Sequence, residues 1–268
     1  MRDRVAKGPL IPYLLWIAFF VIAPIALIVY YSMLDLNGNF TLENYKRFFS
    51  PVYIQMTLTS FFYAVIITFF TLLISYPMAF ILTKTKHKYL WLMFIIIPSW
   101  INLLLKTYAF IGIFGLYGPI NAVVSVFGIE PQQILFTDFS FIFVSVYIFI
   151  PFMIIPIFNS LDKLNPTLVD AARDLGASPF TTFRRVIWPL TIEGVKSGIQ
   201  VTFIPALSLF MITRLIAGNQ VITLGTAIEQ QFLVAQNWGM GSTIAVFLVL
   251  IMLVSMLFTG RKAKGGRV

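Results

Sequence analysis

Hydrophobic residues gather along this chain in long runs, separated by shorter polar and turn-rich segments. A helix that crosses a membrane needs roughly 20 consecutive, mostly apolar residues. The runs therefore predict an all-α, polytopic membrane protein with six transmembrane helices in a single membrane domain over 1–268. The expected spans are residues 10–31, 56–82, 90–113, 139–158, 192–217 and 243–259.

Prolines and polar residues interrupt these runs. Pro98, Pro151 and Pro205 each fall inside an expected span. A proline within a helix frees a backbone carbonyl and bends the helix, which is compatible with a gated pathway, although a single kink without function is common in membranes. Polar groups in a span are tolerated where they face a bundle interior or a water-filled path. The candidate pathway residues in the spans are Trp100, Asn102, Tyr108 and Tyr147, and Asp138 and Glu229 are added from the loops expected on the outer side. Anchoring at the membrane interface is the alternative for Trp100 and Tyr108, and a solvated loop position is the alternative for the two acids.

The longest polar stretch between two spans, residues 165–189, has strong helix signals. Asn165 is suited to cap a helix that begins at Pro166. Gly176 can take the left-handed conformation that ends a helix, and Ser178 before Pro179 repeats the cap-and-proline start. The pattern predicts a helix, a sharp turn and a second helix within a loop over 160–190.

The first of these two helices has one small apolar face. Leu168, Ala171, Ala172 and Leu175 recur at the spacing of a single helix face, while the other positions include Asp170, Arg173 and Asp174. Because this helix carries several charges, we expect it to lie in water, with its apolar face against a partner, and not in the hydrocarbon of the membrane. Local packing or anchoring at the membrane surface is the alternative.

The composition fits a membrane protein, with 59% hydrophobic and 11% charged residues. The formal net charge is +9, and 15 of the 19 lysines and arginines lie before the first span, after the second, within 159–198 or after the last. By the positive-inside rule, both termini and the 165–189 stretch are cytoplasmic. The positive net charge is then explained by membrane topology. It no longer indicates nucleic-acid binding, because no basic patch with interleaved aromatic residues remains.

Several classes of chemistry are excluded by the residues themselves. The chain has no cysteine and one histidine, His87, which lies among lysines in a short loop. It shows no Walker lysine motif and no set of residues for nucleophilic catalysis or metal binding. We therefore expect a chain that is not an enzyme and binds no cofactor.

The 165–189 stretch resembles a family motif. The segment Asp170-Ala171-Ala172, then Gly176, then V-I-W-P at 186–189 matches in spacing the cytoplasmic EAA loop of type I ABC importer permeases, with Asp170, Val186 and Trp188 as the departures. In that family the loop is the coupling helix that enters a groove of the ATPase subunit. The resemblance implies an ATPase-coupling role for Leu168, Asp170, Ala171, Ala172, Leu175, Gly176 and Pro189.

Other segments narrow the resemblance. T-L-E-N-Y at 41–45, P-S-W-I-N at 98–102 and L-D-K-L at 161–164 are similar to PotB-type permeases of spermidine/putrescine importers. The resemblance implies polyamine transport in a bacterial plasma or inner membrane. It also implies a second homologous permease, two cytoplasmic ATPase subunits that bind ATP and Mg, and an extracellular or periplasmic binding protein.

Other cargoes and classes stay open. Lys106 and Arg214 are positively charged and lie in or beside the outer loops, where they would repel a cationic solute. Sulfate, a phosphonate or an amino acid is therefore an alternative solute. An autonomous channel or secondary transporter, or a membrane scaffold, is a further alternative. The chain shows neither the internal repeat nor the buried acidic residues expected of a secondary carrier.

Overall fold

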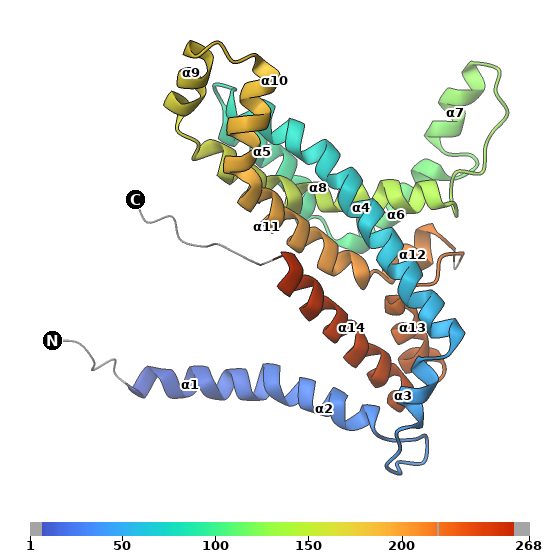
Figure 1. Ribbon diagram of the computed structural model, residues 1–268. Coiled ribbons are helices and arrows are strands. Elements are labelled where there is room, and N and C mark those ends of the chain that lie inside the picture. The colour runs from blue at the N-terminus through green and yellow to red at the C-terminus, as the bar shows by residue number, and fades with distance from the viewer. Residues whose placement is uncertain (1–6, 219, 260–268) are drawn as a thin grey trace. The chain divides into compact units, whose positions relative to one another are not determined.

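The computed structural model describes residues 7–218 and 220–259, and helices make up most of that part of the chain (Figure 1). Within the described residues, the strand-like pairing is limited to an isolated bridge between Leu34 and Phe40. This confirms the all-α prediction. The chain divides into two compact units, Met1–Met56 with Ala227–Ile251 and Thr57–Thr226 with Met252–Val268.

The first unit begins with a long apolar helical segment. It is built from α1 (Lys7–Ile17), a π-helical turn (Ala18–Ile22) and α2 (Ala23–Ser32). Pro24 has no amide hydrogen for the preceding turn, and the wider π-turn lies directly before it, where such a local adjustment is expected. The interruption by Pro24 therefore takes the form of a widened turn.

Short elements complete the first unit. They are α3 (Glu43–Phe48), the start of α4 (Pro51–Thr83), the end of α13 (Leu224–Glu229), a π-turn (Gln230–Val234) and the start of α14 (Trp238–Thr259). The rings of Phe48 and Phe247 stack with centroids 3.9 Å apart. Thr243 Oγ1 donates a 3.1 Å hydrogen bond to the carbonyl of Ser32, tying α14 to the end of α2.

The second unit contains a broken helix where the third span was expected. Residues 90–113 are divided between α5 (Lys88–Ile96), a 3₁₀ turn (Ile97–Trp100) and α6 (Leu103–Phe114). The break follows from Pro98 and from the extended backbone of Ile101, after which Asn102 caps α6 by accepting the Leu104 amide at 2.8 Å. An asparagine cap makes a new helix start favourable at this point.

The core of the second unit lies between α4, α8 (Asp138–Asp162) and the α11 region (Trp188–Leu207). Gly198 allows a close approach of α11 to α8, because a β-carbon there would lie 2.6 Å from Met153 Sδ. The Tyr76 and Thr191 hydroxyls, 2.9 Å apart, join α4 to α11. The buried apolar residues are Tyr76, Ala79, Leu82, Met153, Ile154, Ile157, Phe158, Leu161, Ile187 and Val195.

The expected fifth span also differs from a single helix. Residues 192–217 are covered by α11, a break at 208–210 and α12 (Met211–Ile216). Pro205 lies in the last turn of α11, where it precedes the end of the helix. Among the described residues, five segments are long and apolar enough to cross a membrane, so six spans stay a prediction. They are Ile11–Ser32, Pro51–Thr83, Leu103–Val126, Asp138–Asp162 and Trp238–Leu257.

Candidate functional site

The loop between α8 and α11 begins with the expected capped helix, α9 (Pro166–Asp174). The side-chain oxygen of Asn165 accepts a 3.1 Å hydrogen bond from the Thr167 amide, and Pro166 occupies the first helical position. The cap satisfies an amide that has no partner within the helix, and proline has no amide to satisfy. The predicted start of α9 is confirmed.

The turn after α9 is also as expected. Gly176 has a φ of +80°, and its amide donates to the carbonyl of Arg173 at 2.8 Å. Ser178 Oγ then accepts the Thr181 amide at 3.2 Å, which caps α10 (Pro179–Thr182). A π-turn (Phe183–Ile187) continues α10 into α11, so α9 and α10 form a helix–turn–helix at one end of the second unit (Figure 1).

The apolar face of α9 is largely uncovered in this chain. Leu175 is 89% exposed and Leu168 is 47% exposed, while Ala171 is exposed and Ala172 half-buried. The exposed leucines on this short, charged helix leave apolar surface in contact with water. A partner that binds there would bury that surface. The face therefore has the geometry of a docking surface. Its role in ATPase coupling stays a prediction, as does that of Asp170, Gly176 and Pro189.

The loop is mounted on two tightly packed helices. Gly194 and Gly198 lie one turn apart on α11, and both face α8 where a side chain would clash. Two small residues four positions apart allow helix backbones to approach closely. The loop is therefore supported at both ends by one closely packed helix pair.

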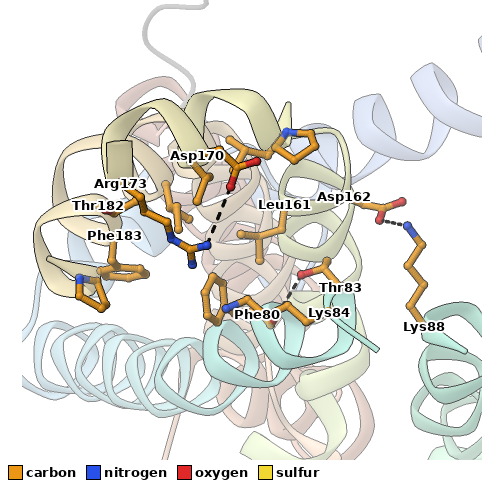
Figure 2. Close-up of a pocket in the computed structure, with 15 residues that line it drawn as sticks. Phe80, Thr83, Lys84, Lys88, Leu161, Asp162, Asp170, Arg173, Thr182 and Phe183 are labelled. Atoms are coloured by element: carbon orange, nitrogen blue, oxygen red, sulfur yellow. Dashed lines mark hydrogen bonds and ion pairs between the residues drawn. The ribbon is translucent and has the colours of Figure 1, made fainter. Parts of the chain in front are cut away.

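A pocket of about 650 Å³ lies beneath α9, between that helix and the ends of α4 and α8. Figure 2 shows Arg173 and Lys84 extending into it from opposite walls. Its lining is Phe80, Thr83, Lys84, Lys88, Leu161, Asp162, Leu164, Pro166, Val169, Asp170, Arg173, Pro179, Thr182, Phe183 and Ile187.

An ion pair closes one side of the pocket. Lys88, at the start of α5, donates a hydrogen bond to Asp162, at the end of α8, and the Tyr89 hydroxyl donates to the other carboxylate oxygen at 2.8 Å. The hydrogen bond with Asp162 raises the pKa of Lys88 above its usual value, so the lysine stays charged. The contact holds the α4–α5 turn against the helix that enters the loop.

The predicted pathway residues have different surroundings and belong to two different units. Trp100 and Tyr108 are 76% and 58% exposed, and Asn102 serves as the cap of α6. Asp138 accepts a 2.7 Å hydrogen bond from the Tyr63 hydroxyl. Tyr147 lines a pocket of about 220 Å³ together with Ser99, Lys106 and Pro151, whereas Glu229 belongs to the first unit. Their role in a pathway stays a prediction.

Sequence reasoning missed two features of this region. The segment G-V-K-S-G at 194–198 carries the small-residue spacing that signals close helix packing, and it could have been read from the sequence. The pocket could not, because Lys84, Asp162 and Arg173 come from three separate helices or their ends.

No protein-family model matches the chain. The spermidine/putrescine transport system permease protein PotB of Haemophilus influenzae is 37% identical over 247 residues, covering 88% of this chain and 86% of the relative. PotB of Escherichia coli is 34% identical over 259 residues, covering 93% and 94%. The inner membrane ABC transporter permease protein YdcU of Escherichia coli is 26% identical, covering 85% and 78%.

Solved structures have the same fold. A bacterial alginate ABC transporter in complex with an alginate pentasaccharide-bound periplasmic protein matches with a TM-score of 0.83 at 15% identity, covering 98% of this chain and 95% of that chain. A second alginate importer structure matches with a TM-score of 0.79 at 17% identity, covering 97% and 94%.

The relatives define the class of this chain as a membrane permease of an ABC transporter, and the solved structures share its fold. The chain belongs to the PotB family of ABC-transporter permeases, with relatives at 34% and 37% identity over most of its length.

Proposed function

We propose that this chain is the permease subunit of an ATP-driven, binding-protein-dependent importer of polyamines such as spermidine and putrescine. The observation that carries the proposal is the similarity over most of the chain, at 34% and 37% identity, to permeases of spermidine/putrescine transport systems. The chain would act in a bacterial plasma or inner membrane, where its apolar helices can span the bilayer.

The α9 face supports a docking role toward a cytoplasmic ATPase. The exposed Leu168 and Leu175, with Ala171 and Ala172 between them, form a narrow apolar surface. A groove of the ATPase subunit could pack closely against this surface. Two ATPase subunits would bind ATP and Mg and move α9 as they close, one acting here and one on a second, homologous permease. This chain would need no cofactor for that role.

The pathway would run along the interface with the second permease. Exposed aromatic faces such as Trp100 and Tyr108 suit an alkylammonium cation, because a ring face attracts cations. Alternating exposure to the two sides would follow from movement of the coupled helices. An extracellular or periplasmic binding protein would deliver the cargo, and the solved alginate transporter is in complex with an alginate pentasaccharide-bound periplasmic protein.

The orientation follows from the distribution of positive charge. The basic Lys84, Lys88 and Arg173 lie together at the α9 end of the second unit, which supports a cytoplasmic position of that end. The proposed cytoplasmic termini depend on the basic leader and tail, which lie largely outside the described residues.

Purification from cells in mild detergent separates this proposal from its rivals. We expect an ATPase subunit and a second permease to accompany the tagged chain. A channel, a secondary transporter or a membrane scaffold would purify without an ATPase, and that result would reject the importer. The identity of the cargo needs an uptake measurement, which distinguishes polyamines from sulfate, phosphonates and amino acids.

A further inference from the structure

The pocket beneath α9 contains two basic groups, Lys84 and Arg173, that have a weak carboxylate partner or none among the described residues. The ammonium of Lys84 lies 3.8 Å from the centre of the Phe80 ring, and none of the ion pairs among the described residues includes it. Arg173 comes only to 3.9 Å of Asp170, and these two side chains are 60% and 65% exposed. A solvated pair at that distance contributes little to stability, so both cations are available to an anion.

A buried hydroxyl adds a third polar group to the lining. Thr182 is 2% exposed, and its Oγ1 finds no hydrogen-bond partner among the described residues. Buried polar groups in native proteins are nearly always hydrogen-bonded, and one without a partner calls for a missing ligand or water. A ligand oxygen in this part of the pocket would supply that partner.

The remaining wall is largely apolar. Phosphate alone would leave this surface in contact with water, whereas an amphipathic anion would cover it. The ligand that fits combines a compact negative group with a hydrocarbon or glycerol portion. The apolar lining residues are Phe80, Leu161, Leu164, Val169, Phe183 and Ile187.

The position of the pocket at the ends of two candidate spans indicates that its ligand is a membrane lipid. The candidate spans Pro51–Thr83 and Asp138–Asp162 both end at its rim, and Lys84 is the first residue after one of them. Where apolar spans end, side chains meet phospholipid headgroups, and basic pockets between helices on the cytoplasmic side bind acidic ones.

We propose that this pocket binds the phosphate headgroup of an acidic phospholipid. Lys84 and Arg173 contact the phosphate, the Thr182 hydroxyl donates to one of its oxygens, and the apolar wall covers the glycerol and the first acyl carbons. Of the two acids in the lining, Asp162 is already paired with Lys88 and Tyr89. Asp170 forms only a 3.9 Å, solvent-exposed pair with Arg173, which a phosphate can replace. The bound lipid ties α9 to the end of α4.

The test measures lipid binding to the purified full-length chain by native mass spectrometry in detergent. Phosphatidylglycerol and phosphatidylcholine are titrated in separate arms, and inorganic phosphate is titrated alone and as a competitor. We expect phosphatidylglycerol to bind in preference to phosphatidylcholine, and Lys84→Gln and Arg173→Gln each to weaken that binding about tenfold through loss of a charge-assisted contact. Thr182→Val should weaken it about threefold, through loss of one hydrogen bond.

Lys86→Gln is the matched control, because Lys86 lies exposed in the same α4–α5 turn but does not line the pocket. We expect its binding to equal that of the unmodified chain. Equal weakening by Lys86→Gln, or none by Lys84→Gln, would mean general surface attraction and would overturn the proposal. Inorganic phosphate that binds as tightly as the lipid would assign the pocket to a soluble anion. Displacement of lipid by the ATPase subunit, with Lys84→Gln weakening ATPase binding, would assign it to that protein.

Discussion

Gly194 of α11 packs so closely against Ser160 of α8 that no space remains between the two helices for a β-carbon. A β-carbon at Gly194 would also lie 2.6 Å from the carbonyl oxygen of Pro156, a backbone atom that cannot rotate away. These two helices enter and leave the loop that carries α9. Their close contact therefore fixes the two ends of this loop relative to each other.

Replacing Gly194 by alanine should therefore separate α8 from α11 and destabilise the protein. Overpacking of a tight contact costs about 1–3 kcal/mol, which should lower the midpoint of thermal unfolding in detergent by several degrees. Gly112→Ala is the control, because Gly112 lies in α6 with no atom within 4 Å of an added β-carbon. An equal effect of the two substitutions would contradict the packing account.

The end of α9 depends on a backbone conformation that disfavours side chains. Gly176→Val places a branched residue at a φ of +80°, at a cost of about 1–2 kcal/mol, and should reorient the turn into α10. We expect transport to be lost while the protein remains in the membrane, as judged by uptake and by the amount in membrane fractions.

Gly128→Val serves as the comparison for Gly176→Val. Gly128 has a φ of +75° and no neighbour within 4 Å, so the local strain is similar but lies far along the chain from α9. Retained uptake in the Gly128 variant and loss in the Gly176 variant are expected. If both variants transport normally, the turn after α9 has no part in coupling.

The loop could be predicted from the sequence because its signals are local. Asn165, Gly176 and Ser178 act on amides and turns within three residues of themselves, so their effect does not depend on the rest of the fold. The division of 90–113 was harder to place. Pro98 indicated an interruption, but the restart of the helix at Asn102 depends on the extended backbone of Ile101.

A bulky side chain on the apolar face of α9 should block docking. Ala172 is a half-buried residue of α9. In Ala172→Trp, the large side chain would occupy the space in which we propose that the ATPase contacts α9. Loss of a well-packed interface centre commonly costs 2 kcal/mol or more, so we expect at least about thirtyfold weaker retention of the ATPase during purification. Ala122→Trp, at an exposed alanine of α7, should retain it. ATPase retention by both variants would reject α9 as the contact.

The Lys88–Asp162 pair should matter more than an ordinary surface pair. Asp162 is bound by both Lys88 and Tyr89 and its side chain is 18% exposed, whereas Glu193 pairs with Lys196 in solvent and is 60% exposed. Asp162→Ala should destabilise by about 1–3 kcal/mol because two donors lose their acceptor. Glu193→Ala should change stability by less than about 1 kcal/mol. Thermal unfolding of the two variants side by side measures the difference, and equal midpoints would contradict it.

Long-range relations of this kind could not be read from the chain. Lys88 and Asp162 are 74 positions apart, and nothing in their local sequence indicates the contact. The pathway could not be read from the chain either. The sequence indicates Trp100, Tyr108 and Tyr147 as candidates, but their use depends on the second permease that we propose, whose residues are not part of this chain.

The central claim is tested most directly by uptake into proteoliposomes that contain the complete complex, with ATP inside and the binding protein outside. Labelled spermidine, putrescine, sulfate, a phosphonate and an amino acid are supplied in separate reactions, with ADP-loaded vesicles as the control. We predict accumulation of spermidine or putrescine that requires ATP and is abolished by Ala172→Trp. ATP-dependent accumulation of another solute, with no polyamine uptake, would contradict the proposed cargo. Polyamine uptake that is equal with ADP would contradict the importer itself.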